Sequence, residues 1–371
     1  MTATKGLEGI VAASSSISSI IDGVLTYRGI NIDELAEQAS FEEVAYLLWE
    51  GKLPTQSELD GLIEQLGEYA AVPEQAMNVV RSFPDGSNAM AALRTAVSSL
   101  ALYDPEAAEM SREANLRKAI RLQAQLPTLV AAFARIRTGR QPIAPKKGVG
   151  IAHNLLYMLT GEEPAEVAVQ AMDKALVLHA DHELNASTFA ARVTVATLSD
   201  IYSGVCSAIG ALKGPLHGGA NEAVMIMLDE IGTPDRVESY IMDKLGNKEK
   251  IMGFGHRVYR NGDPRAKHLQ EMSRKLGELK GDTRLYEMSV QIEALVTGQK
   301  GLKPNVDFYS ASCYTMLGIP RDLFTPLFAI SRVSGWTAHI LEQYDNNRLI
   351  RPRAEYVGPT DQHYVPISRR G

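Results

Sequence analysis

The sequence predicts a mainly α-helical protein, and three observations support this. Apolar residues recur at helical spacing in one segment after another. Strand-like patterns are confined to residues 9–13 and 24–27, which is enough at most for a small N-terminal sheet. The chain has 371 residues, of which 45% are hydrophobic and 22% charged, as is usual for globular proteins of one or two domains.

The predicted helices begin near the N-terminus with two capping boxes. Ser40 precedes Glu43 by three residues, and Thr55 precedes Glu58 by the same spacing, so each pair can satisfy free N–H groups at a helix start. The apolar stretch 187–212 is interrupted by charges, which predicts a buried helix or helix pair rather than a membrane span. Further helical patterns cover residues 88–102, 114–138, 164–180, 220–231, 265–279, 284–296, 308–317 and 321–344.

Glycine, proline and charged residues concentrate between residues 213 and 303. We expect residues 215–312 to form a smaller helical domain, inserted into a larger, discontinuous helical domain of residues 1–214 and 313–371. An active site between the two domains would follow a common arrangement of ligand sites.

The charge and the cysteines limit the classes of function. A net charge of −6 provides no basic field for nucleic acid or an anionic membrane, so neither is an expected partner. Cys206 and Cys313 stand in apolar stretches without CxxC spacing, which indicates buried free thiols in a reducing compartment. Patterned sequence begins within a few residues of Met1 and leaves no room for a targeting peptide, so we expect a cytoplasmic protein.

Reactive side chains stand among glycines and prolines in three separated segments, residues 214–219, 253–265 and 304–307. Each segment precedes a helical pattern, so the turns would present these side chains at helix starts. Together they supply two histidines, one carboxylate and several arginines, a set that suits a small anionic substrate.

The two histidines each have a functional and a plain interpretation. His217 lies before the predicted helix 220–231, whose positive end disfavours an imidazolium; it should be a neutral hydrogen-bond donor, or else a turn histidine bonded to a carbonyl. His256 precedes three arginines within ten residues, which favours a bound anion over a solvated basic turn. Arg265 can pair bidentately with a carboxylate, and Arg260 has the reach for a phosphate.

Three further residues carry open interpretations. Asp307, at the start of the predicted helix 308–317, is either an N-cap or a general base that the helix dipole holds ionised. Arg332 interrupts an apolar helical stretch, and a buried arginine requires a partner such as a substrate carboxylate. Arg351 lies in a C-terminal segment that looks extended, where an exposed tail cation is the plain alternative.

A rival hypothesis rests on His179 and His182, which stand three residues apart with carboxylates between and beside them. Such a cluster can bind a metal and would predict a metal-dependent hydrolase. However, the sequence has no HExxH motif and no third cluster of ligands.

Nine short segments occur in an order typical of one enzyme family. Residues 6–10, 27–29 and 47–54 are similar to the N-terminal signature of citrate synthases. The family's active-site blocks are matched by residues 179–185, 214–221, 253–265, 305–307, 331–332 and 351–353. The resemblance implies condensation of acetyl-CoA with oxaloacetate and hydrolysis of citryl-CoA to citrate and CoA, the entry step of the tricarboxylic acid cycle. It also implies a homodimer that closes on its substrate and needs no metal or other cofactor.

The resemblance assigns a role to each matching residue. Asp307 resembles the base that takes a methyl proton from acetyl-CoA. His217 resembles the donor that stabilises the enol at the thioester oxygen, and His256 the donor that polarises the ketone of oxaloacetate.

The binding residues also follow from the resemblance. The groups that bind oxaloacetate are matched by His182, Arg265, Arg332 and Arg351, and Arg351 would reach in from the neighbouring subunit. The CoA-binding region is matched by Arg260 and by the backbone at Ile251, Gly253 and Gly255.

Three alternatives stay open beside this function. A 2-methylcitrate synthase would use propionyl-CoA on the same scaffold, and one methylene is worth only about 1–3 kcal/mol in a pocket. The metal-dependent hydrolase and a non-catalytic helical scaffold are alternatives of other classes. The chain also departs from the family pattern in a short turn after Gly23, in the serines at residues 14–16 and at residues 87–90.

Overall fold

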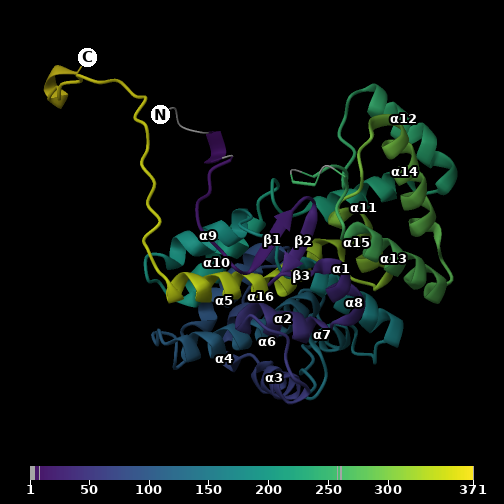
Figure 1. The fold of residues 1–371 in the computed structure, drawn as a ribbon, viewed down its shortest axis with the longest axis horizontal. Helices are drawn as coiled ribbons and strands as arrows, with labels where there is room; N and C mark the ends of the chain where they lie inside the picture. The colour runs from purple at the N-terminus through teal and green to yellow at the C-terminus, as the bar shows by residue number, and fades with distance from the viewer. Residues whose placement is uncertain (1–4, 8, 257, 260, 371) are drawn as a thin grey trace.

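The computed structural model describes residues 5–7, 9–256, 258–259 and 261–370. Helices dominate this part of the chain, which confirms the predicted fold class. It contains sixteen α-helices and one three-stranded sheet (Figure 1). No helix in these ranges is both long and apolar enough to cross a membrane.

The sheet is a small antiparallel meander near the N-terminus. β1 (Ser18–Ile21) pairs with β2 (Val24–Tyr27), and β2 pairs with β3 (Ile30–Asn31). Asp22 and Gly23 form a two-residue turn with φ of 52° and 81°, and two positive φ values are typical of a type I′ hairpin turn. The strand predicted at residues 24–27 is confirmed. The one predicted at 9–13 is wrong, because that stretch is largely exposed and pairs with no described strand.

Both predicted capping boxes form. Ser40 begins α2 (Phe41–Glu50) and Thr55 begins α3 (Gln56–Tyr69), each with reciprocal bonds to a glutamate three residues on. The stretch 187–212 is the helix pair α9 (Ala186–Val195) and α10 (Ile201–Leu212). The other eight predicted helices coincide within a few residues with α5 (Ala89–Leu100), α6 (Arg112–Ile136), α8 (Glu166–His179), α11 (Ala220–Ile231), α13 (Ala266–Lys280), α14 (Arg284–Lys300), α15 (Val306–Met316) and α16 (Phe324–Asp345).

Four short helices escaped sequence analysis: α1 (Ile32–Gln38), α4 (Glu74–Arg81), α7 (Ile151–Thr160) and α12 (Val237–Gly246). The last three have no side-chain cap, so no capping motif precedes them in the sequence. Packing against neighbouring helices determines them instead.

α16 is the central helix of the larger group of helices. It is buried along almost its whole length, including Trp336 and Arg332, and packs against α2, α6, α8, α9 and α10. In Figure 1 this group lies in the lower half of the molecule, with the small sheet at its upper edge. A charged guanidinium inside this core is the first sign of a functional site.

Helices α11 to α15 form a second group, at the upper right of Figure 1. α13 packs on α15 and α14, α11 packs on α15, and α12 packs on α14. α13 also contacts α8, and α11 contacts α16, so the two groups meet along these helices. α15 runs through residue 312 without a break, so the predicted boundary there falls inside a helix, and the division into two domains stays a prediction.

The chain leaves the helical body after α16. We call residues 346–370 the C-terminal arm; Figure 1 shows it extending away from the helices. It contains only one short 3-10 helix, and four of its apolar side chains are strongly exposed: Tyr356, Val357, Tyr364 and Ile367.

Candidate active site

Two of the three predicted turns are joined by backbone hydrogen bonds. The N–H of Asn305 donates to the Gly253 carbonyl at 2.9 Å, and the N–H of Gly255 donates to the Lys303 carbonyl at 2.9 Å. The Asn305 amide also donates to the Gly255 carbonyl at 3.0 Å. Gly253 has φ of 80°, and a Cβ there would come within 2.8 Å of the Phe308 ring, so this close approach requires glycine. The turn before His256 therefore lies against the start of α15.

Asp307 is the second residue of α15 rather than its N-cap. The cap is Asn305, whose side chain accepts the Asp307 N–H at 3.1 Å, so the N-cap interpretation of Asp307 is wrong. No described residue donates a hydrogen bond to the Asp307 carboxylate. Burial raises its pKa to about 6, although Arg265 and Arg332 act in the opposite direction. Burial, and not the helix dipole, therefore determines the direction of the pKa shift of Asp307. Because pH 7 lies above this pKa, the carboxylate is ionised near neutral pH and can accept a proton.

His217 lies in the turn before α11 and contacts α9. Its Nε2 accepts the backbone N–H of Ser187 at 3.2 Å and lies 2.7 Å from the Ser187 hydroxyl. A backbone N–H can only donate, so Nε2 carries a lone pair and the proton of the neutral ring is on Nδ1. Burial and the nearby Arg332 lower the pKa of His217 to about 4. The expectation of a neutral donor therefore agrees with this geometry.

His256 has the opposite tautomer. Its Nδ1 accepts the backbone N–H groups of Val258 and Tyr259 at 3.0 and 3.3 Å, which leaves the proton on Nε2. Burial and Arg265 lower the pKa of this ring to about 4, so it too is neutral at pH 7. The two histidines thus present N–H groups from different ring nitrogens.

The predicted anion-binding groups lie beside these histidines. The His182 ring is 5.2 Å from the His256 ring, and its Nε2 is 3.0 Å from the Tyr259 hydroxyl. Arg265 is buried and is held by Asp263, with contacts of 2.9 Å from Nε and 2.8 Å from Nη2. Asp263 also accepts the Val306 N–H at 3.0 Å, so one carboxylate joins Arg265 to the start of α15.

Arg332 is 1% exposed and has few partners for its charge. Its Nε donates to the His179 carbonyl at 2.7 Å, and its guanidinium lies over the Phe328 ring at 4.6 Å. No described residue accepts a bond from either Nη group. Since a buried cation is costly without an anion, this guanidinium is available for a carboxylate ligand.

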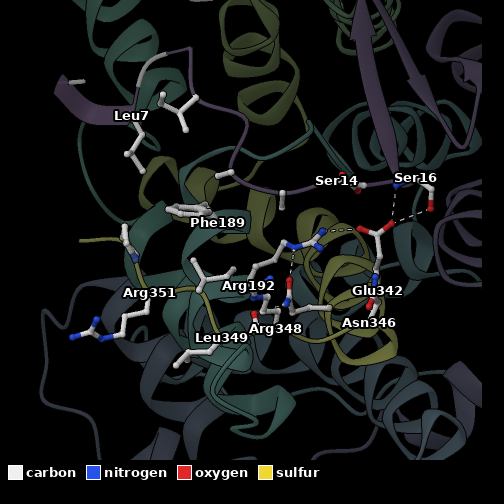
Figure 2. Close-up of a pocket in the computed structure, with 17 residues that line it drawn as sticks. Leu7, Ser14, Ser16, Phe189, Arg192, Glu342, Asn346, Arg348, Leu349 and Arg351 are labelled. Carbon is white, nitrogen blue, oxygen red and sulfur yellow. Dashed lines mark hydrogen bonds and ion pairs between the residues drawn. The ribbon is translucent and has the colours of Figure 1, made fainter. Parts of the chain in front are cut away.

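The structure does not bring Arg351 to this group. It is exposed at the start of the C-terminal arm, where it lines a separate cavity of about 800 Å³ (Figure 2). The same cavity is lined by Leu7, Phe189, Arg192 and Glu342. Of the predicted CoA-binding residues, Ile251 and Gly253 are buried beneath the His256 turn, Gly255 lies on it, and Arg260 is outside the described residues.

The metal-site hypothesis finds no support in the geometry. The Nδ1 atom of His179 lies 2.7 Å from the Ala175 carbonyl, and its ring packs on Phe328. His182 faces Tyr259 and His256 instead. In the described ranges, no three histidine, cysteine or carboxylate side chains gather as metal ligands would. Both cysteines are free, with Cys313 buried and Cys206 half-buried.

Several residues that hold the site side chains in place were not predicted from the sequence. Ser187, Asn305 and Asp263 fix the ring of His217, the start of α15 and the guanidinium of Arg265. Only Asn305 had a detectable signal, since it is an N-cap residue type just before a helical pattern. Ser187 acts across the fold and leaves no local signature, whereas Asp263 bonds Arg265 from only two residues away.

Comparisons with known proteins agree with the geometry. Residues 6–353 match the family model described as citrate synthase, C-terminal domain. "Citrate synthase 2" of Bacillus subtilis (strain 168) is 64% identical over 371 residues, which covers 100% of both chains. The chain belongs to the citrate synthase family. It is therefore an enzyme of the acyl-transferring, condensing type.

Other relatives include an enzyme with a different name and a solved structure. "2-methylcitrate synthase 1" of Corynebacterium glutamicum is 44% identical, covering 99% of this chain and 98% of its own. The solved citrate synthase of Thermoplasma acidophilum, a ternary complex with carboxymethyl coenzyme A and oxaloacetate, has a TM-score of 0.92 at 36% identity, covering 100% of both chains. The similarity thus extends to the fold as well as to the sequence.

Proposed function

We propose that the site condenses acetyl-CoA with oxaloacetate, with Asp307 as the base. The decisive observation is the Asp307 carboxylate, which has no donor among the described residues and lies near two buried arginines. One of these, Arg332, also acts on the neutral His217, and the other, Arg265, on the neutral His256. A base needs a free lone pair, and the enolate that forms needs N–H donors already in place. Both requirements are met by side chains of this chain.

The reaction then proceeds in three steps. Asp307 removes a methyl proton from acetyl-CoA while the Nδ1–H of His217 donates to the thioester oxygen. The enol carbon attacks the ketone carbon of oxaloacetate, whose oxygen accepts a bond from the Nε2–H of His256. Water finally hydrolyses the citryl thioester to give citrate and CoA. The imidazoles and guanidiniums supply the electrophilic stabilisation, so the proposal includes no metal or other cofactor.

Oxaloacetate is a dianion, and we assign its binding to His182, Arg265 and Arg332. Among the described residues, the guanidinium of Arg332 bonds only a backbone carbonyl, whereas the charge of Arg265 is already paired with Asp263. The solved Thermoplasma relative, whose title names oxaloacetate and a CoA analogue, supports this assignment by similarity. For the CoA moiety we propose Ile251, Gly253, Gly255 and Arg260.

We further propose a homodimer in which Arg351 completes the neighbouring subunit's site. Two observations support it: Arg351 is remote from its own chain's site, and the arm that carries it exposes apolar side chains that a second subunit can cover. Helices α11 to α15 would act as a smaller domain that closes over oxaloacetate. A cytoplasmic location agrees with the free cysteines.

Propionyl-CoA is the competing substrate, because 2-methylcitrate synthases are among the relatives. Acetyl-CoA is favoured since the citrate synthase relative is 64% identical and the 2-methylcitrate synthase 44%. The test is thiol release from each CoA ester with oxaloacetate, with and without EDTA. We expect kcat/KM to be higher for acetyl-CoA and unaffected by EDTA. A preference for propionyl-CoA would reverse the assignment, and loss of activity in EDTA would contradict the metal-free mechanism.

A further inference from the structure

The loop that carries His182, residues 180–185 between α8 and α9, is held from two sides. On one side lies α16, which contacts it through residues on a single helical face. Arg332 donates to the His179 carbonyl, and the backbone at Gly335 is so close that a Cβ there would lie 2.3 Å from the Ala180 oxygen. One turn further along, His339 Nε2 lies 3.2 Å from Asp181 Oδ2.

On the other side lies the β1–β2 hairpin. Ser18 of β1 donates to Asp181 Oδ2 and accepts the backbone N–H of Glu183 at 2.9 Å. Tyr27 of β2 is fully buried, and its hydroxyl is bonded to both the N–H and the carbonyl of Asp181, at 3.2 and 3.0 Å. The Ile20 N–H donates to the Glu183 carboxylate at 2.6 Å. Hairpin and helix therefore meet at Asp181, the residue directly before His182.

The Asp181 carboxylate is a costly group in a protein interior. It is fully buried, and Oδ1, next to Gly335, has no hydrogen-bond partner in the described chain. Although burial opposes the charge, His339, Arg332 and Ser18 hold its pKa below the usual value. Two residues on, Glu183 adopts a positive φ of 49°. Unpaired acceptors and strained backbone persist mainly where function needs the geometry they impose.

The tautomer of His339 is fixed by a chain of charged groups. Arg192 Nη1 donates to His339 Nδ1 at 3.1 Å, so His339 donates through Nε2 to Asp181. Arg192 is paired with Glu342 at 2.6 Å, and Glu342 accepts the Ser16 N–H at 2.7 Å just before β1 (Figure 2). The network therefore begins and ends on the N-terminal segment, at Ser16 and at Ser18.

We propose that Asp181 is a positioning residue, which fixes His182 for oxaloacetate by tying its loop to both Ser18 and His339. This rests on the proposed role of His182. His182 can contact the substrate only if the loop keeps its path, and displacements of about 1 Å in a site can cost up to 100-fold. The Asp181 carboxylate bonds Ser18 and His339 and none of the three residues proposed for the chemical step, so we expect it to act on binding rather than on that step.

The test is Asp181→Asn, which keeps the shape but removes the charge that Ser18 and His339 both contact. We expect the KM and the Kd for oxaloacetate to rise about tenfold or more, while kcat and the KM for acetyl-CoA change less than about threefold. The control is Asp104→Asn. Asp104 is also a buried carboxylate, 3% exposed, but its side chain bonds Arg121, Tyr202 and the Glu106 N–H, outside this loop. It should lower the melting temperature without changing the KM for oxaloacetate.

A second pair of variants covers the case in which Asp181→Asn does not fold. Ser18→Ala removes one donor to Asp181, and Ser18→Thr keeps the hydroxyl. The alanine variant should raise the KM for oxaloacetate at least about threefold, and the threonine variant should restore it. An unchanged KM in Asp181→Asn or in Ser18→Ala overturns the proposal. Wild-type protein that releases no thiol at all would instead overturn the proposed function.

Discussion

The turns that we propose to be catalytic differ from the C-terminal arm in how they are held. The His217 ring accepts a bond from the Ser187 N–H of α9, and the turn before His256 is bonded to the start of α15, where Asp307 lies and where Asp263 accepts the Val306 N–H. The arm, in contrast, makes mostly local bonds, such as the Tyr356 hydroxyl to the Pro359 carbonyl, and exposes its apolar side chains. Bonds within one chain therefore determine the geometry of the turns, whereas under our proposal a second subunit would fix the position of Arg351.

The difference indicates which parts of the proposed site a single chain is sufficient to position. Proton transfer requires the reacting atoms to be held in a productive geometry, and the bonds that hold the turns are internal to the chain. Charge on a substrate acts over a longer range, so an arginine on an arm can contribute to it once a second subunit fixes the arm. Five experiments can test this division, from the largest expected effect to the smallest.

The first prediction tests the turns directly. Asp307→Asn should lower kcat at least about 100-fold with little change in oxaloacetate affinity, because it removes only the proton acceptor. Thiol release and calorimetry measure the two quantities. Asp307→Glu is the control, since it keeps a carboxylate and should retain more activity. Near-normal turnover by the asparagine variant would show that Asp307 is only a residue of the first helical turn.

The second prediction tests the arm. Asp307→Asn and Arg351→Ala subunits, each nearly inactive, are unfolded together and refolded. If Arg351 acts in the neighbouring site, a mixed dimer has one site with both defects and one with neither. Random pairing makes about half of the dimers mixed, so roughly a quarter of all sites should become active. If native mass spectrometry detects mixed dimers but activity does not return, Arg351 acts in its own subunit.

The third prediction concerns pH and separates the base from the histidines. Because the pKa of Asp307 is raised to about 6, this carboxyl becomes protonated below that pH and can no longer act as a base. The kcat/KM for acetyl-CoA should fall about tenfold per unit below pH 6. His217 and His256 have pKa values of about 4 and stay neutral over this range. A midpoint near 4, with folding unchanged by circular dichroism, would contradict the role of Asp307.

The sequence predicted the positions of the turns and the extended form of the arm for a physical reason. Glycine, proline and helix starts are local signals, so His217, His256 and Asp307 were recognisable from their neighbours. Positions 9–13 had a strand-like pattern, but no strand in the described chain pairs with them. The partners of His217 and His182, which are Ser187 and Tyr259, come from distant segments, and a single sequence does not record such contacts. Whether Arg351 has a partner in a second subunit stays a prediction.

The fourth prediction tests whether the two helix groups move. Oxaloacetate should tighten the binding of a non-reactive CoA analogue about tenfold and lower the radius of gyration in X-ray scattering, because it draws α11–α15 toward the larger group. Arg332→Lys should lose both effects, since a lysine does not reproduce the planar guanidinium. Equal affinity for the analogue with and without oxaloacetate would contradict closure.

The smallest expected effect is a change in stability that also distinguishes the turns from the arm. The pKa of Asp307 in the folded state, about 6, lies above its ordinary value of 3.8. The folded state therefore binds more protons than the unfolded state between these values, and stability decreases as pH rises through this window.

At pH 7 the full cost of the buried charge is present, and Asp307→Asn removes it. The variant's melting temperature should exceed that of the wild type by roughly 2–4 °C at pH 7 and match it near pH 4. Arg351→Ala, on the exposed arm, should show no such pH-dependent gain. A lower melting temperature for Asp307→Asn at pH 7 would mean that the carboxylate stabilises the fold. That result would contradict the proposal that this site keeps a destabilising buried charge because catalysis requires it.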